Sequence, residues 1–80
     1  MRKRSGQSAP KQLVVCVDND GYAVSLEKRK IYVALPNDAT EKRGLLRVID
    51  ESGEDYLYPK MFFRRIALPQ PVKKAVLAAA

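Results

Sequence analysis

Apolar runs alternate with polar turn sequences along the first 68 residues of the chain. Residues 13–17, 31–35 and 45–49 are rich in β-branched and other aliphatic side chains, and their lengths suit β-strands. Residues 56–58, a shorter segment, and residues 64–68 are read as two further strands. The pattern therefore predicts five short strands.

The segments between these runs carry the residue types of turns. Residues 18–21 and 50–54 combine Asp, Asn, Ser and Gly, residues 27–30 are all charged, and residues 22–26 read as extended or loop-like. Residues 60–63 are too few for a full helix and suit one 3₁₀ turn. Short turns between short strands favour antiparallel pairing.

A structured loop and a short helix complete the predicted elements. Asp38 and Glu41 have the spacing of a capping box, which predicts one or two helical turns before Gly44. After the prolines that flank Gln70, apolar residues recur at helical spacing through residue 79. We expect this helix to cover one open end of the domain, the alternative being an exposed apolar tail.

The chain of 80 residues is long enough for one small domain. We predict an all-β fold, a five-stranded antiparallel small barrel over residues 12–68 with a 3₁₀ turn before the last strand. Residues 1–11 would precede it as a disordered basic arm, and residues 69–80 would follow it as a short C-terminal helix or tail. No segment reads as a crossover helix for a parallel sheet.

A family resemblance covers about residues 13–68, including the apolar segments on either side of the charged turn in residues 26–35, and one stretch is its most specific part. Residues 58–63, Tyr-Pro-Lys-Met-Phe-Phe, are similar to the apolar–Pro–x–x–aromatic–apolar segment of Src-homology-3 domains, in which a 3₁₀ turn joins the last two strands. The resemblance implies a small barrel of that type and places Pro59 and Phe62 at ligand-groove positions. The first strand lacks the aromatic residues that peptide-binding members use to grip prolines. Residues 46–53 are also similar to short bacterial proteins of uncharacterised function.

Charge is unevenly distributed along the chain. Fifteen Lys and Arg residues against nine Asp and Glu residues give a net charge of +6, of which +4 lies in residues 1–11. That arm is too poor in apolar residues to order itself, and no apolar segment follows it as in a secretory signal. No run is long enough to span a membrane. With a single cysteine, the expected location is the cytoplasm.

The composition excludes several kinds of chemistry. There is no His, no Trp and one Cys, so a disulfide framework, a Cys/His zinc site and histidine acid–base catalysis are excluded. Cys16 lies in an apolar strand and reads as a small buried hydrophobe rather than a nucleophile. We therefore expect no enzyme activity and no cofactor.

Two acidic groupings have ordinary explanations. Asp18, Asp20 and Glu27 match part of a calcium loop, but the preceding segment is a strand where that motif needs a helix, so we read a simple turn. The second grouping surrounds the Ser-Gly pair of the predicted hairpin and reads as solvated, with docking of a basic partner as the alternative. Its members are Asp50, Glu51, Glu54 and Asp55.

Three functions remain, of which binding to another protein leads. The expected contact residues lie around the 3₁₀ turn and are Tyr58, Pro59, Phe62 and Arg64. The alternative is electrostatic binding of RNA or DNA through the arm and the basic turn, that is, through Arg2, Lys3, Arg4, Lys28, Arg29 and Lys30. The third is an accessory subunit whose thin core is completed by a larger assembly. We expect a monomer with no membrane partner.

Overall fold

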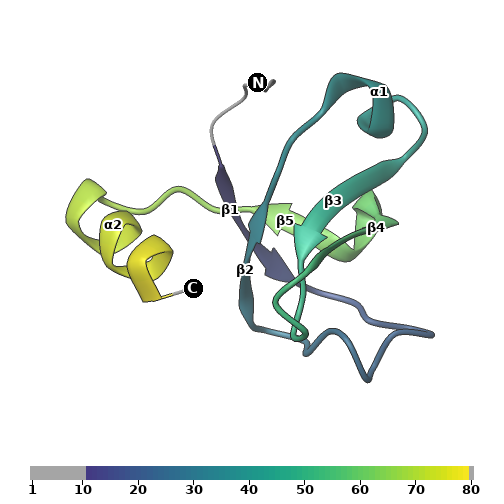
Figure 1. Ribbon diagram of the computed structural model, residues 1–80, viewed down its shortest axis with the longest axis horizontal. Helices are drawn as coiled ribbons and strands as arrows, with labels where there is room; N and C mark the ends of the chain where they lie inside the picture. The colour runs from purple at the N-terminus through teal and green to yellow at the C-terminus, as the bar shows by residue number, and fades with distance from the viewer. Residues whose placement is uncertain (1–10, 80) are drawn as a thin grey trace.

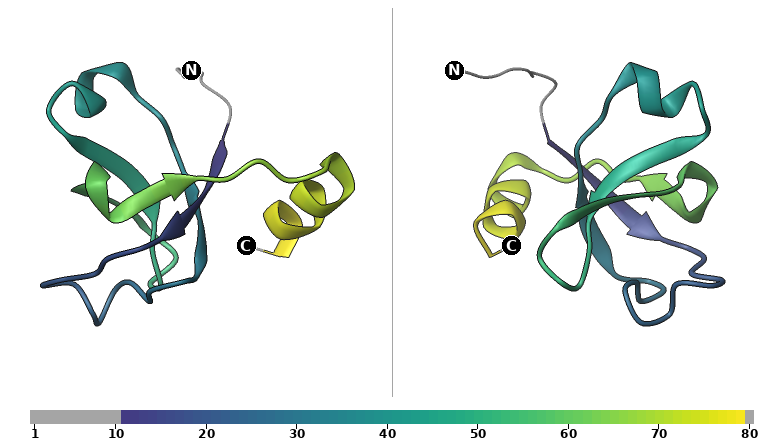
Figure 2. Two further views of the ribbon diagram at one scale, coloured as in Figure 1. Left: turned by 180° about the vertical axis from the view of Figure 1, so that it is seen from behind. Right: turned by 45° about the vertical axis from the view of Figure 1, so that its right-hand side comes forward.

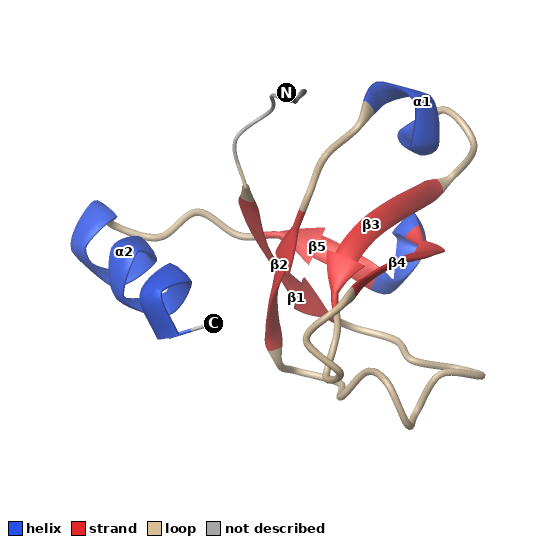
Figure 3. Ribbon diagram, in the orientation of Figure 1, coloured by secondary structure: helices blue, strands red, loops and turns tan. Residues whose placement is uncertain are grey.

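The computed structural model of the chain describes residues 11–79. Its strands are β1 (Gln12–Cys16), β2 (Ile31–Ala34), β3 (Leu45–Ile49), β4 (Asp55–Pro59) and β5 (Phe63–Arg65). Its helical elements are α1 (Asp38–Glu41), the 3₁₀ turn η1 (Lys60–Phe62) and α2 (Gln70–Ala79). Figure 1 shows them in place, and Figure 3 separates strands from helices by colour. The five predicted strands, the 3₁₀ turn and the C-terminal helix are therefore confirmed.

All the described strands pair antiparallel in one sheet with the order β4-β3-β2-β1-β5. The strands cross at steep angles, so the sheet curls around its core (Figure 3). Within the described residues, β4 and β5 are its edges and share no ladder. The small barrel expected from the sequence is thus an open sheet, because no ladder joins β4 to β5.

The last strand is shorter than the sequence pattern indicates. We expected residues 64–68, whereas β5 ends at Arg65. Val14 is paired with Arg65, and the N–H of Ile66 donates to the carbonyl of Leu13 at 3.1 Å. Since β1 begins at Gln12, the chain beyond Ile66 has almost no neighbouring strand left to pair with.

The core lies inside the curl of the sheet. Alternate residues of β3, Leu46 and Val48, point inward, as the period-2 pattern requires. Cys16, Leu26 and Val48 are the largest fully buried side chains among the described residues. Leu26 comes from the loop of residues 17–30, here called the long loop, so this loop contributes to the core as well as covering it.

Hydrogen bonds close the base of the long loop. The N–H of Cys16 donates to the carbonyl of Lys30 at 2.9 Å, and the N–H of Arg29 donates to the carbonyl of Cys16 at 2.7 Å. Arg29 has a φ of 72°, the only positive φ of a non-glycine residue in the described part of the chain. A left-handed residue that is not glycine costs about 1 kcal/mol, which the two closing bonds offset.

The structured loop after β2 contains α1, as expected, but with a different cap. Asn37, rather than Asp38, is the N-cap, and its side chain accepts from the N–H groups of Ala39 and Thr40 at 2.9 and 3.2 Å. An Asn caps as well as an Asp, and here it comes one residue earlier. Gly44 ends the loop with a φ of 76°.

Helix α2 stands to one side of the sheet, joined to β5 by residues 66–69 (Figures 1 and 2). None of its described residues is buried. The expectation that it covers an open end of the domain is therefore wrong. Val72 is exposed, and Val76 and Leu77 are only half-buried, so the apolar face of α2 is too small to seal the core.

Candidate binding surface

A hollow with a volume of about 340 Å³ lies between the long loop, the turn after β3 and strand β4. We call it the aromatic hollow; its lining residues are Tyr22, Ser25, Asp50, Ser52, Tyr56, Leu57 and Tyr58. The ring of Tyr22 lies edge-on to the rings of Tyr58 and Phe62, with centroids 5.1 and 5.9 Å away. Edge-to-face pairs of this kind contribute about 1 kcal/mol each in addition to the free energy gained by burying apolar surface, so they hold the long loop over the core.

The floor of the aromatic hollow contains a buried carboxylate. Asp50 is 7% exposed and accepts from the Tyr58 hydroxyl at 2.5 Å, the Ser52 hydroxyl at 2.5 Å and the Ser52 N–H at 2.8 Å. Burial alone would raise its pKa, but these hydrogen bonds outweigh burial and hold the pKa of Asp50 below its ordinary value. The prediction that this acid is solvated is therefore wrong.

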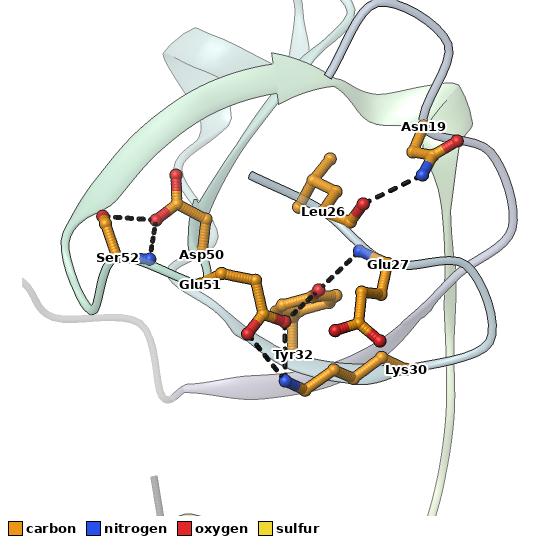
Figure 4. Close-up of polar contacts among 8 residues, drawn as sticks. All are labelled: Asn19, Leu26, Glu27, Lys30, Tyr32, Asp50, Glu51 and Ser52. Carbon is orange, nitrogen blue, oxygen red and sulfur yellow. Dashed lines mark hydrogen bonds and ion pairs between the residues drawn. The ribbon is translucent and has the colours of Figure 1, made fainter. Parts of the chain in front are cut away.

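A second polar cluster fastens the long loop to the same turn (Figure 4). The Tyr32 hydroxyl accepts from the Glu27 N–H at 2.7 Å and donates to Glu51 Oε2 at 2.5 Å, while Lys30 Nζ lies 2.6 Å from that oxygen. Lys30 and then Tyr32 lower the pKa of Glu51. Asn19 adds a bond from its side-chain amide to the carbonyl of Leu26 at 2.9 Å. One wall of the aromatic hollow is therefore held rigidly.

Two of the large apolar side chains that are exposed in the described residues, Tyr22 and Tyr56, line the aromatic hollow. The exposed ones in the long loop, β4 and η1 are Val17, Tyr22, Val24, Tyr56 and Met61, whereas Ile31 and Val72 are the other two in the described residues. Val24 is 97% exposed and Met61 is 72% exposed. Single exposed apolar residues need no explanation, but two exposed aromatic rings that line one hollow are typical of a binding surface.

The predicted protein-contact residues are brought near one another but are unequally accessible. Tyr58 and Phe62 are 3% and 8% exposed and lie beneath Tyr22. Pro59 is half-buried at the end of β4. Arg64 is exposed, and its guanidinium donates to the carbonyls of Met61 and Phe63 at 3.0 and 2.9 Å. The rings available to a partner are therefore not the two that the sequence singled out.

The protein-contact residues expected from the sequence did not include Tyr22 or Tyr56, which form the accessible rim of the aromatic hollow. Both residues are large and aromatic, but neither lies in the most specific stretch of the family resemblance. The only local signal for Tyr22 is its place directly after an Asp-Asn-Asp-Gly turn. Its packing on Tyr58 joins segments that are far apart in the chain, and no local pattern reveals it.

The predicted basic residues fall into two groups. Arg2, Lys3 and Arg4 lie outside the described residues, together with the rest of the predicted arm except Lys11. Lys28 and Arg29 are exposed, but Lys30 is ion-paired with Glu51. The basic turn is thus partly neutralised by its surroundings.

The remaining candidates have structural roles. Asp18 accepts from the N–H of Asp20 at 3.1 Å, which is the self-capped turn that its sequence favours. Cys16 is fully buried, its thiol donates to the carbonyl of Asp18 at 3.1 Å, and burial raises its pKa. In residues 11–79 there is no group of three or more His, Cys, Asp or Glu side chains placed to hold a metal ion.

Comparisons with models of protein families, with curated proteins and with solved structures found no match. Among the described residues, no helix is long and apolar enough to cross a membrane.

Proposed function

We propose that the chain is a non-enzymatic module that binds a segment of another protein across the aromatic hollow. The observation that carries this proposal is the pair of exposed aromatic rings that line that hollow. Tyr22 and Tyr56 form its rim, and Met61 lies on the neighbouring η1. Aromatic and Met side chains are the types enriched at protein interfaces, because they supply large contact areas.

Charge around the aromatic hollow indicates the chemistry of the partner. The turn from Asp50 to Asp55 contains four acids and no base. Asp50 is satisfied internally, but Glu54 lies at the rim, where it accepts from the Tyr56 hydroxyl at 3.1 Å. A partner segment with an apolar anchor next to a Lys or Arg fits this surface best. The apolar anchor would supply most of the affinity, and the charge would supply orientation.

The fold supports the family resemblance as part of this proposal. The strand order β4-β3-β2-β1-β5, with η1 directly before β5, fits a variant of the Src-homology-3 type barrel whose edges remain open. Such folds commonly serve as binding modules, although function depends on the site rather than the fold. We further propose that the module acts as a monomer in the cytoplasm, where its single thiol stays reduced.

Selection of peptides from a displayed random library, followed by NMR titration of the isotope-labelled protein, tests this proposal. We expect the selected peptides to combine an aromatic or aliphatic residue with Lys or Arg and to shift the amides of Tyr22, Ser25 and Ser52. Tyr56→Ala should weaken binding by about 1–2 kcal/mol, as expected for an interface anchor.

A matched control is Val72→Ala, since Val72 is 46% exposed on α2, away from the hollow. It should leave peptide binding unchanged. The proposal fails if no peptide is enriched, or if the amide shifts centre on α2 and β5.

A further inference from the structure

The structure reveals a separation of charge that the net charge conceals. Residues 12–59 contain six basic and nine acidic residues, whereas residues 60–80 contain five basic residues and no acid. The cationic segment comprises η1, β5 and α2. The chain enters β1 beside the end of β5, because Val14 pairs with Arg65. Lys11 directly precedes Gln12, the first residue of β1, and therefore lies near the chain that leaves β5.

A second hollow lies on this side, with a volume of about 370 Å³. We call it the basic hollow; its lining residues are Gln12, Leu13, Arg65, Ile66, Ala67, Leu68, Gln70 and Lys73. The lining contains two cations, two side-chain amides and no carboxylate. Its polar side chains are therefore mainly hydrogen-bond donors, set against an apolar wall from Leu13, Ile66 and Leu68.

The cations of the basic hollow have no anionic partner within the described residues. The ion pairs among the described residues involve three other cations, Lys30, Arg47 and Lys60. Glu41 lines a smaller adjoining cavity together with Arg65. Glu41 is already paired with Lys60 at 3.0 Å. Arg65 and Lys73 thus keep their full charge for a ligand, unlike the basic turn near Glu51.

We propose that Lys11, Arg65, Lys73 and Lys74 bind the phosphate backbone of a nucleic acid, with one phosphate seated in the basic hollow. Cations on two elements, separated by an acid-free segment, suit a polymer with regularly repeated negative charge better than a single small anion. The side-chain amides of Gln12 and Gln70 add donors suited to phosphate oxygens. This surface is separate from the aromatic hollow, so neither proposal depends on the other.

Fluorescence anisotropy with a labelled single-stranded RNA of about 20 nucleotides, in a salt series, tests this assignment. The variant Arg65→Gln/Lys73→Gln should lose two phosphate contacts. The slope of log K against log[salt] should then fall by about 1.4, and affinity at about 0.1 M salt should fall by about 25-fold. A duplex DNA probe shows which nucleic acid is preferred, and either preference supports the proposal.

Two control variants remove the same charge elsewhere. Lys42→Gln/Arg43→Gln changes two exposed cations after α1, and Lys28→Gln/Arg29→Gln changes the basic turn. Each should alter the slope far less than the Arg65/Lys73 variant, and thermal melts followed by circular dichroism should show that all three variants fold.

Several results would overturn the assignment. One is the absence of RNA and DNA binding by the unaltered chain at low salt. Another is an equal loss of binding in all three double variants, which would mean that the nucleic acid binds to the overall positive charge and not to this surface. A third is displacement of the RNA by polyglutamate at equal charge concentration, which would assign the surface to an acidic protein instead.

Discussion

The bond between the Tyr58 hydroxyl and the buried Asp50 carboxylate offers the sharpest test of how this fold is held together. Asp50 is 7% exposed and accepts three hydrogen bonds, one of which comes from Tyr58 at 2.5 Å. Tyr58→Phe removes that donor and leaves the ring in place. A hydrogen bond to a charged group contributes about 1.5–3 kcal/mol, so we expect a loss of about 2 kcal/mol at pH 7. In a domain of this size that loss lowers Tm by about 8–16 °C.

The same strand provides a matched control. Tyr56 also donates to a carboxylate, Glu54, but at 3.1 Å and on a side chain that is 49% exposed. Water replaces that bond when it is removed, so Tyr56→Phe should cost less than about 0.5 kcal/mol. The difference between the two variants isolates burial as the cause, because both remove one hydroxyl from β4.

The effect of Tyr58→Phe should depend on pH in a defined direction. The folded-state pKa of Asp50 lies below its ordinary value, so ionisation of Asp50 stabilises the fold above the unfolded pKa of about 4. This contribution is lost as pH falls through the lowered folded pKa. Without Tyr58 as a donor, the folded pKa of Asp50 rises. The stability difference between the two proteins should therefore shrink below about pH 4.

Urea unfolding followed by far-ultraviolet circular dichroism measures these values, since the chain has no Trp to report by fluorescence. The double variant Tyr58→Phe/Asp50→Asn completes a thermodynamic cycle and should show a coupling energy of about 1 kcal/mol or more. A Tyr58→Phe variant as stable as Tyr56→Phe, or a stability loss that is the same at pH 3 as at pH 7, would refute the reasoning.

Two further predictions concern the long loop. Because Arg29 has a φ of 72°, Arg29→Gly should leave the free energy of unfolding unchanged or raise it by up to about 1 kcal/mol. The neighbouring variant Lys28→Gly should lower it by about 0.5–1 kcal/mol. Equal losses of stability in urea titrations of the two variants would contradict this prediction. Burial, and then the hydrogen bond to Glu51, raise the pKa of Tyr32. The neutral form of Tyr32 therefore stabilises the fold below the unfolded tyrosine pKa of about 10, and this stabilisation is lost as the pH rises further. Tyr32→Phe should therefore make the urea midpoint fall less steeply between about pH 9 and 11; an unchanged slope would contradict the link.

Much of the local structure could be predicted from the pattern of residues. The apolar runs predicted all five strands, because each strand needs only an inward face of alternating apolar residues, as Leu46 and Val48 provide in β3. Residues 60–63 predicted η1 because they are too few for a longer helix. The left-handed Gly44 followed equally from local chemistry.

The candidate site was less predictable because it depends on contacts between distant segments. The sequence shows four acids around a hairpin, but the fold brings Tyr58 to one of them, eight residues away, and makes Asp50 a buried anchor. Tyr22 reaches the same place from the long loop. The exposed rim therefore belongs to Tyr22 and Tyr56 rather than to Tyr58 and Phe62.

The strands and the turns could be predicted from the sequence, because they depend on neighbours within a few residues. That the sheet is open became clear only from the tertiary structure, in which no ladder joins the two edge strands β4 and β5. The tertiary structure also decided where the positive charge gathers. Pairing of β1 with β5 brings Gln12 beside Arg65 and Lys73, since antiparallel neighbours place the start of one strand beside the end of the other.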